Sequence, residues 1–411
     1  MKLVKTLLIV FAVLALALPA AAADKATNLK EAFTKGKVRG EIRFYTFQRD
    51  FDKTTTDRQD IAAGGSLHYE TAPLYGINLG FTFYTSQGMG LNDDDKAVYG
   101  LLASDNGKHQ SYSVLGESYI QGTFGGTTIK IGRQEMRTLF VNVHDIRLTP
   151  QTFMAYQLQN TSLPGTTFTL AYVTQVKRRT STTFETMSDF TGAGKDSEVL
   201  TAGVVYKGIK GLKLQLWDAY ANDIMNALFF QADYSFKVAE DFGLFFSGQY
   251  LNEKDKGDKL AGKIDTHMFG LKAGFKTMGF TFYLAYNAVG DESAALYPWG
   301  GCPQYSSIQI FDGNRADEKT VLGKLAYDFG RLGLKGLSAY VLHARYDTPD
   351  SGVNASPDRK ETDFNLQYNF SGALKGLSIR ARMAIVDQDE ALGGEDFNDY
   401  RLYIKYAFNL L

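Results

Sequence analysis

The sequence predicts an all-β fold, a transmembrane antiparallel β-barrel of 18 strands with short periplasmic turns and long extracellular loops. Between Lys37 and Phe408, about eighteen segments alternate apolar and polar residues, as strands between lipid and water do. The links between these segments alternate between tight turns and long polar loops, which gives the barrel a turn side and a loop side. The composition agrees, because Tyr (24), Phe (29) and Gly (41) are abundant and Pro (8) is scarce.

The N-terminal segment is typical of a secretory signal peptide. Lys2 and Lys5 form a basic start, Leu7 to Leu18 is apolar, and the small residues 21–23 precede Asp24. The alternative is a membrane anchor, but about twelve apolar residues are too few to span a bilayer of roughly 30 Å. We therefore expect a signal peptide at 1–23 and one barrel domain at 24–411.

Charge and composition narrow the function classes. The formal net charge is −1, which argues against a nucleic acid partner. The single cysteine, Cys302, cannot form an internal disulfide, so the hydrogen-bond ladder of the strands has to hold the fold. No spacing indicates a metal site or a cofactor; Asp93 to Asp95 is better explained as a solvated loop.

An enzyme is not expected. His144, Asp145 and His343 are the only residues that suggest acid-base or nucleophilic chemistry, and the sequence does not assemble them into one site.

Side-chain alternation assigns the two faces of the first strand, because successive side chains of a strand point to opposite sides. The residues expected to contact lipid are Val38, Gly40, Ile42 and Phe44, and those expected to face water are Arg39, Glu41, Arg43 and Tyr45. The expected strands are 37–49, 58–70, 76–85, 112–124, 127–134, 151–160, 166–175, 199–207, 212–221, 226–236, 242–251, 264–275, 279–288, 319–329, 336–347, 361–370, 376–387 and 398–408.

The connections set the topology. Short links at 71–75, 125–126, 161–165, 208–211, 237–241, 276–278, 330–335 and 371–375 fall on one side, and long loops fall on the other. An even number of strands with both termini on the turn side follows. The link at 222–225 is an exception, because it is short although it belongs to the loop side.

The strand number predicts a pore, because about eight strands would be filled by side chains whereas eighteen leave an aqueous channel. A selective pore needs a constriction. We expect the loop 135–150 to fold inward and supply it, through Arg137, His144, Asp145 and Arg147. The alternative is that this loop points outward.

Strand parity also predicts a basic stripe along the pore wall. Closing the barrel makes the first strand the neighbour of the last, so cations from both ends of the chain gather there and attract anions. The expected members are Arg39, Arg43, Lys324, Arg345, Arg380, Arg382, Arg401 and Lys405. The alternative is that Glu41, Asp363 or loop carboxylates neutralise each of them.

Three segments resemble the OprD-type outer-membrane porins: Gly40 to Phe51, Ile131 to Glu135 and Arg147 to Phe153. The resemblance implies an eighteen-strand, substrate-selective channel with an inward third loop, used mainly for small carboxylate-bearing nutrients. It also implies a basic ladder at Arg39, Arg43, Arg380, Arg382, Arg401 and Lys405. The chain departs from the family at its end, Phe408 to Leu411, and in its loops, so a particular substrate is not transferred.

The function expected is passive, substrate-selective diffusion of small polar or anionic solutes through the outer membrane. The alternative is a surface adhesin or scaffold built on the same barrel. Outer-membrane lipid and lipopolysaccharide are the expected surroundings, and the basic residues 177–179 lie in a predicted external loop that either contacts lipopolysaccharide or is solvated. The sequence leaves open whether the protein is a monomer or a trimer.

Overall fold

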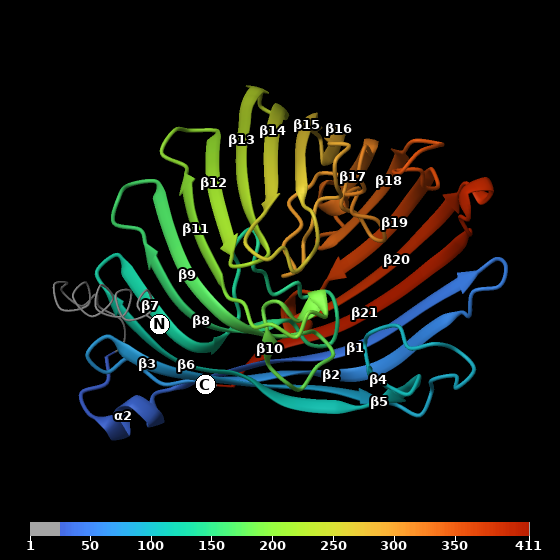
Figure 1. The fold of residues 1–411 in the computed structure, drawn as a ribbon. Coiled ribbons are helices and arrows are strands. Elements are labelled where there is room, and N and C mark those ends of the chain that lie inside the picture. Colours follow the sequence, from blue (N-terminus) through green and yellow to red (C-terminus); the bar gives the residue numbers. More distant parts are fainter. Residues whose placement is uncertain (1–24, 411) are drawn as a thin grey trace.

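The computed structural model describes residues 25–410 as a closed antiparallel barrel of 18 strands (Figure 1). The signal peptide expected at 1–23 lies outside the described residues. The barrel strands are β1 (Lys37–Phe51), β2 (Arg58–Glu70), β3 (Ile77–Gly88), β6 (Tyr112–Phe124), β7 (Thr127–Gln134), β8 (Thr152–Asn160), β9 (Thr166–Lys177), β11 (Val199–Tyr206), β12 (Leu212–Ala221), β13 (Met225–Ala239), β14 (Phe242–Asp255), β15 (Asp265–Thr277), β16 (Phe280–Val289), β17 (Lys319–Asp328), β18 (Leu337–Asp347), β19 (Arg359–Asn369), β20 (Leu377–Gln388) and β21 (Phe397–Asn409).

Closure of the barrel depends on the pairing of its first and last strands. Each strand pairs with its neighbours in the chain, and β1 pairs antiparallel with β21, with Arg43 opposite Lys405 and Phe51 opposite Phe397. This pairing leaves no free sheet edge, so every strand finds its backbone partners inside the wall.

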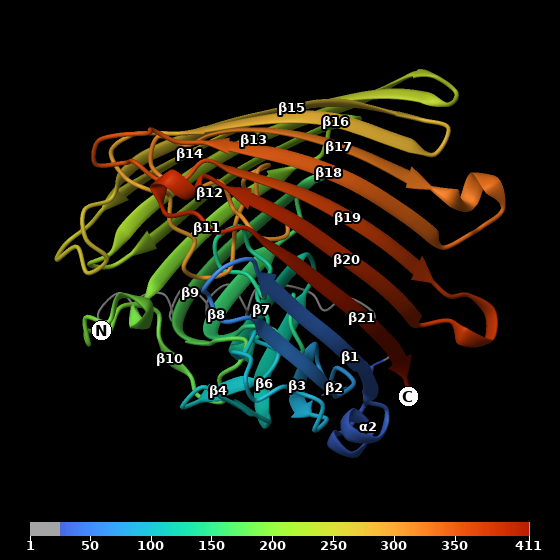
Figure 2. The ribbon, with the colours of Figure 1, turned by 90° about the vertical axis from the view of Figure 1, so that its right-hand side faces the viewer.

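The remaining elements are short. A helix, α2 (Leu29–Thr34), begins after Asn28, whose side chain accepts a hydrogen bond from the Glu31 amide, and it lies on the turn side of the barrel (Figure 2). On the loop side, β4 (Ala103–Asp105) pairs with β5 (Lys108–Gln110), and β10 (Glu185–Thr186) pairs with β9. Four 3-10 turns occur at η1 (Asp189–Thr191), η2 (Phe329–Leu332), η3 (Gly372–Leu374) and η4 (Glu390–Leu392). None of the helices between residues 25 and 410 has the length and apolar character to span a bilayer.

The predicted fold class is confirmed, and each of the expected strands is present. The boundaries differ most at the C-terminal end of β14, which runs to Asp255 because its pairing with β13 continues to Met225. The short link 222–224 is real. Asp223 there has φ 57°, the left-handed conformation of a tight turn, so this hairpin closes on the loop side without changing the strand count.

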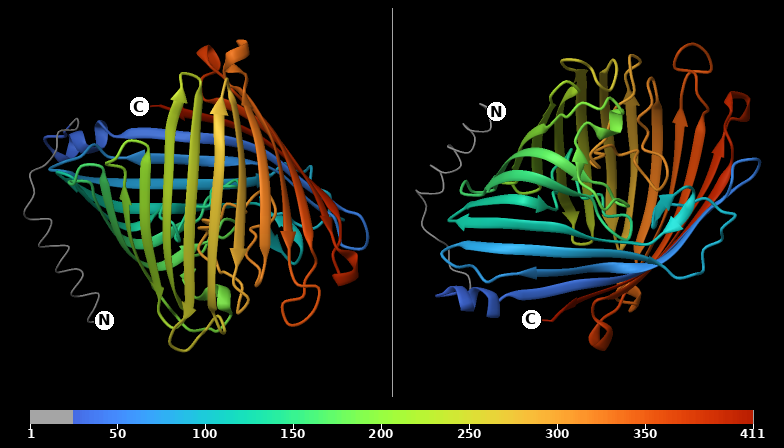
Figure 3. Two further views of the ribbon diagram at one scale, coloured as in Figure 1. Left: turned by 90° about the horizontal axis from the view of Figure 1, so that it is seen from above. Right: turned by 60° about the horizontal axis from the view of Figure 1, so that its bottom comes forward.

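The two faces of the wall differ as the alternation predicts. On β12, Leu216 is 49% exposed on the outside, whereas its neighbour Trp217 is 7% exposed on the inside. Loop segments cross the interior of the barrel (Figures 1 and 3). Met187, Ile224 and Trp299 from these loops pack on inward side chains of β8 to β16 and form the largest apolar cluster. These loops therefore fill part of the lumen.

A substitution pair on β12 tests the assignment of the faces. Leu216→Arg places a charge on the lipid side and is expected to lower the unfolding free energy by about 2–4 kcal/mol. Gln215→Arg, one residue away but facing the lumen, is expected to change it by less than about 1 kcal/mol. Denaturant unfolding in lipid vesicles measures both, and equal losses would contradict the assignment.

Candidate pore constriction

The loop 135–150 lies inside the barrel, against the inner face of β1. It leaves β7 and returns to β8, yet Asp145 forms a two-point ion pair with Arg43 of β1, with N–O distances of 2.6 and 2.7 Å. The same guanidinium donates to the Arg147 carbonyl at 3.0 Å, and Leu148 is fully buried. Arg43 is 6% exposed, so a buried guanidinium of the wall holds this loop inside the lumen through Asp145.

A second loop, 290–318, completes this inner structure. Its Trp299 carbonyl accepts from the Asn142 amide at 3.0 Å, and its Gly301 amide donates to Phe140 at 3.2 Å. Trp299 also donates from Nε1 to the Met187 carbonyl at 2.9 Å, which joins a third loop. Sequence reasoning missed the role of 290–318. The signal was available, because this long loop carries Tyr297, Trp299, Ile308, Ile310 and Phe311, which a solvated loop does not need.

Wall carboxylates hold the loops in place by accepting their backbone N–H groups. Glu361 of β19 accepts from Ile310 and Phe311 at 2.8 and 3.0 Å, and Glu253 of β14 accepts from Leu296 at 2.8 Å. Both carboxylates are fully buried. A buried carboxylate needs such donors, so these two acids are committed to loop anchoring.

Asp399 of β21 anchors a different set of groups. Arg401 and Arg49 donate to it at 2.7 and 3.1 Å, Gln309 donates at 2.8 Å, and the Tyr99 hydroxyl donates as well. Tyr99 belongs to the loop between β3 and β6, which thereby also enters the lumen. Asp399 carries one negative charge against the two positive charges of Arg49 and Arg401, so it neutralises only part of the positive charge around it.

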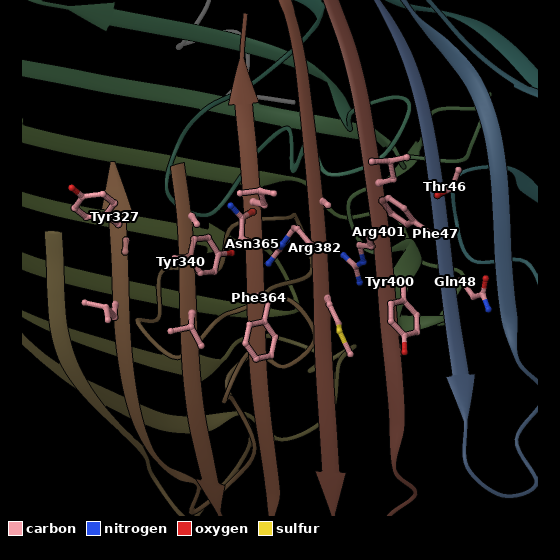
Figure 4. A pocket seen from close by; sticks show the side chains of 18 of the residues that line it. Thr46, Phe47, Gln48, Tyr327, Tyr340, Phe364, Asn365, Arg382, Tyr400 and Arg401 are labelled. Atoms are coloured by element: carbon pink, nitrogen blue, oxygen red, sulfur yellow. The ribbon is translucent and has the colours of Figure 1, made fainter. Parts of the chain in front are cut away.

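The loops and the wall border a cavity of about 580 Å³, open to the lumen and lined by five arginines. These are Arg49, Arg147, Arg179, Arg382 and Arg401. Arg382 and Arg401 are cross-strand partners on β20 and β21 and lie side by side in Figure 4. The nearby carboxylates are Asp312, Asp363 and Asp399, which leaves an excess of two positive charges.

Two of these arginines have no acidic partner. Arg147 lies 5.0 Å from the Phe47 ring and Arg179 donates to His144 at 3.0 Å, and within residues 25–410 no carboxylate is within ion-pair distance of either. Burial, together with Arg401 and Arg179, lowers the pKa of Arg147 to about 10. Burial, together with Arg179 and Arg147, lowers the pKa of His144 to about 4, so the ring is neutral and accepts the bond from Arg179.

A second cavity of about 650 Å³ lies on the turn side of the loop. It contains Arg39, Arg43, Lys130 and Arg137, but also Glu41, Glu117, Glu135 and Asp145, so its charges nearly balance. Arg137 pairs with Glu135 at 2.8 Å, and Lys405 pairs with Glu41. Arg39 has no carboxylate within ion-pair distance in the described part of the chain.

The residues of the predicted basic stripe thus fall into two groups, those paired with a carboxylate and those without one. Arg43, Arg401 and Lys405 are paired, and Arg382 is 3.5 Å from Asp363. Arg380 donates to Asn365 at 2.5 Å, and Lys324 lies 4.0 Å from the Tyr340 ring centroid. The inner wall also carries lysines that the sequence reading missed, Lys213, Lys272 and Lys276. Lys213 and Lys272 lie on strands with clear alternation, so parity could have placed them on the inner face, whereas Lys276 fell in the expected link 276–278.

Arg345 does not belong to the stripe, and its predicted lumenal position is wrong. Leu342, Ala344 and Tyr346 of β18 are buried inside, which places Arg345 and His343 on the outer face. Arg345 opposes Val321, which is 57% exposed, and pairs with Asp347 at 3.0 Å. Near the rim of the barrel, a charged residue can face either side of the wall. The position of one such residue therefore does not show which face of the strand lines the lumen.

Neither interpretation of the triplet 177–179 holds, because Lys177 is fully buried and Arg179 lies in the arginine cavity. His144 and His343 lie on opposite sides of the wall, so they do not form one catalytic site. Within the described residues no group of three or more metal-ligating side chains gathers.

A closed barrel with polar loops folded into its interior defines an outer-membrane pore protein. The model of the outer membrane porin, OprD family, matches residues 31–410, so the chain belongs to this family. Porin D from Pseudomonas aeruginosa is 26% identical over 399 residues, which is 90% of each chain.

Solved structures show the same fold. Pseudomonas aeruginosa OccK9 (OpdG) matches with a TM-score of 0.83 at 22% identity, over 92% of this chain and 100% of that one. Pseudomonas aeruginosa OpdK with vanillate matches with a TM-score of 0.80 at 22% identity and the same coverage. Acinetobacter baumannii OccAB3 matches with a TM-score of 0.81 at 20% identity, over 92% and 100%.

The anchor between Arg43 and Asp145 can be tested by Asp145→Asn. A charge-assisted hydrogen bond contributes about 1.5–3 kcal/mol, so its loss should raise amide hydrogen exchange across 138–148 by roughly ten- to a hundredfold. We also expect larger and noisier single-channel conductance. Asp94→Asn, in an exposed loop, is the control and should change neither; the same effect in both variants would contradict the anchor.

His144 makes the packing of this loop pH-dependent. Its pKa is about 4 when packed and near 6.5 when released, so the released loop binds more protons between these values. The packed state is therefore most stable above pH 6.5 and loses stability as the pH falls toward 4. Hydrogen exchange at 138–148, corrected for its intrinsic pH dependence, should rise over this range, and His144→Gln should flatten the profile. Identical slopes would refute the role of His144.

Proposed function

We propose that this porin carries out passive, substrate-selective diffusion of small hydrophilic solutes that bear a carboxylate. The observation that carries the proposal is the pair Arg147 and Arg179, two guanidinium groups without an acidic partner in a lumenal cavity of about 580 Å³. Guanidinium groups bind carboxylates in a bidentate geometry, and a narrow, partly desolvated channel strengthens their field.

Further groups of the same cavity support this solute class. Arg382 Nε and Gln309 Oε1 are buried and have no hydrogen-bond partner, so a bound solute would satisfy polar atoms that the protein leaves open. In the proposed path, the loop 135–150 is the constriction, and Arg380, Lys324, Lys405 and Arg39 continue the cationic surface toward the turn side. OpdK was solved with vanillate, whose name is that of a carboxylate anion, which agrees with this class.

The proposal assigns the protein no catalytic step. Selectivity arises from binding at the arginine cavity, and the flux follows the concentration gradient of the solute.

Neutralising the two unpaired arginines tests the proposal. The double variant Arg147→Gln/Arg179→Gln removes the excess positive charge, so we expect the anion-to-cation permeability ratio in planar bilayers to fall by roughly three- to tenfold. Uptake of benzoate into liposomes should fall with it, while uptake of a neutral sugar should not.

Arg345→Gln is the matched control, because it removes the same side chain from the outer face and should leave the reversal potential unchanged. An unchanged reversal potential in the double variant would sink the carboxylate proposal. The absence of discrete conductance steps in the wild type would instead favour the adhesin or scaffold alternative.

A further inference from the structure

A third cavity, of about 1080 Å³, lies at the turn side of the barrel on strands β12 to β16 (Figure 2). These strands carry no member of the predicted basic stripe. Among the described residues, Asp233 is the one carboxylate that lines the cavity, and it is the direct cross-strand partner of Lys213. The lysines that line the cavity are Lys207, Lys210, Lys213, Lys237, Lys272 and Lys276. Five of these six lysines are therefore left without a matching acid.

The lysines of β15 lie on the inner face of the wall. Lys272 and Lys276 are separated by even numbers of residues from the buried Met268, so all three side chains point to the same side. The Lys272 Nζ atom lies 4.2 Å from the ring centroid of Tyr305, which belongs to the inward loop 290–318. Both ammonium groups therefore face the lumen and its water, and not the lipid.

One cross-strand row brings two of the lysines to either side of a glycine. Gly243 of β14 pairs with Lys237 of β13 and with Lys276 of β15. Neighbouring strands are about 4.8 Å apart and direct partners share a face, so the two lysine Cα atoms are about 10 Å apart on the inner wall. The space above Gly243 is open, because a Cβ there would meet only the Phe236 carbonyl, at 3.3 Å. The two long side chains can therefore reach one anion above Gly243.

The lysines of the inner wall have no acidic neighbours across the strands. The direct partners of Lys272 and Lys276 carry no charge, and they are Gly243, Ser247, Thr281 and Ala285. Within residues 25–410, no carboxylate lies within ion-pair distance of Lys237, Lys272 or Lys276. Thr281, beside Lys276, adds a hydroxyl group to the same row.

The acids nearest to this row are held elsewhere. Both carboxylate oxygens of Asp233 accept from Gln231 Nε2, at 2.8 and 2.9 Å, and Gln231 lies closer to the loop side. In the turn between β13 and β14, Asp241 pairs with Arg331, and Glu240 is exposed. The positive charge above Gly243 is thus not compensated by the wall.

We propose that Lys237, Gly243 and Lys276 form a second anion site of the lumen, which takes the phosphate group of a small soluble solute such as a sugar phosphate. In the described part of the chain, no arginine lines this cavity. An ammonium group is a compact point charge with three N–H donors, whereas the guanidinium fork matches a planar carboxylate. A phosphate monoester carries a charge of about −1.5 to −2 at pH 7 and has three acceptor oxygens. It can accept from Lys237 and Lys276 together, and Lys272 strengthens the field around it.

This site is separate from the arginine cavity. The two cavities share no lining residue, and they differ in the donors that they present. The inference therefore does not rest on the carboxylate proposal.

Titration of the detergent-solubilised protein with glucose 6-phosphate, followed by phosphorus NMR line width, tests the proposal. The wild type should bind the ligand, and Lys237→Gln/Lys276→Gln should bind it about tenfold more weakly or less, because two charge-assisted hydrogen bonds are lost. Gly243→Val fills the space between the lysines without changing the charge, and it should weaken binding as well.

The matched control is Lys335→Gln/Lys375→Gln, which removes two exposed lysines from turns at the same end of the barrel but outside the cavity. It should leave the affinity for glucose 6-phosphate unchanged, and so should Arg147→Gln/Arg179→Gln. Heat-modifiable migration in electrophoresis confirms that each variant is folded.

Three results would overturn the phosphate site. The first is equal affinity in the wild type and in Lys237→Gln/Lys276→Gln. The second is an equal loss in the control pair, which would show a general effect of charge at the turn side. The third is a benzoate affinity that falls as much as that of glucose 6-phosphate in Lys237→Gln/Lys276→Gln, because the site would then take any anion. Loss of binding in the arginine variant alone would place the phosphate in the arginine cavity and would contradict the assignment too.

Discussion

The pairing of β1 with β21 is the constraint on which the rest of this molecule depends. An open sheet in a bilayer would leave two rows of backbone groups without partners, and each unsatisfied group costs several kcal/mol. Closure removes both rows, and it also gives every strand a fixed inside and outside. The pairing brings Arg43 beside Lys405, and Arg49 beside Asp399, although these residues lie at opposite ends of the chain. The lumenal charges are neighbours because the wall is closed.

The interior of such a wide barrel needs its own means of support. The inward loops rest on ionic and hydrogen-bonded anchors, since their backbone groups would otherwise be buried without partners. Arg43 holds the loop 135–150 through Asp145, and Glu361 holds the loop 290–318 through the Ile310 and Phe311 amides. The apolar cluster around Trp299 then packs these loops against the inner face of β8 to β16. The arginine cavity lies between these loops and the wall.

The strands of the wall could be predicted from the sequence because the alternation of apolar and polar side chains along each strand shows which side chains face lipid and which face the lumen. The sequence also predicted the inward loop from its polar content and position, and Arg382 and Arg401 from clear parity on β20 and β21. The predicted lumenal position of Arg345 was wrong, because near the rim of the barrel a charged side chain reaches water from either face of the wall. Sequence reasoning also missed Arg179, which lines the cavity, and Tyr99, which contacts Asp399 and Arg401, because no periodic pattern encodes the conformation of their loops. The partners of Asp399 come from residues 49, 99, 309 and 401, so only the fold reveals them.

Some lumenal arginines are paired with carboxylates and others are not, because the number of lumenal acids is limited. Glu361 and Glu253 accept loop amides, and Asp145 and Asp399 are bound to Arg43 and Arg401, so these carboxylates are occupied in holding the structure. A buried cation that has lost such a partner is costly, which is why the anchoring arginines are paired. Arg147 and Arg179 remain unpaired in a cavity open to water, where a mobile anion can compensate them. The proposed selectivity thus depends on the charge that is left over once the loops have been anchored.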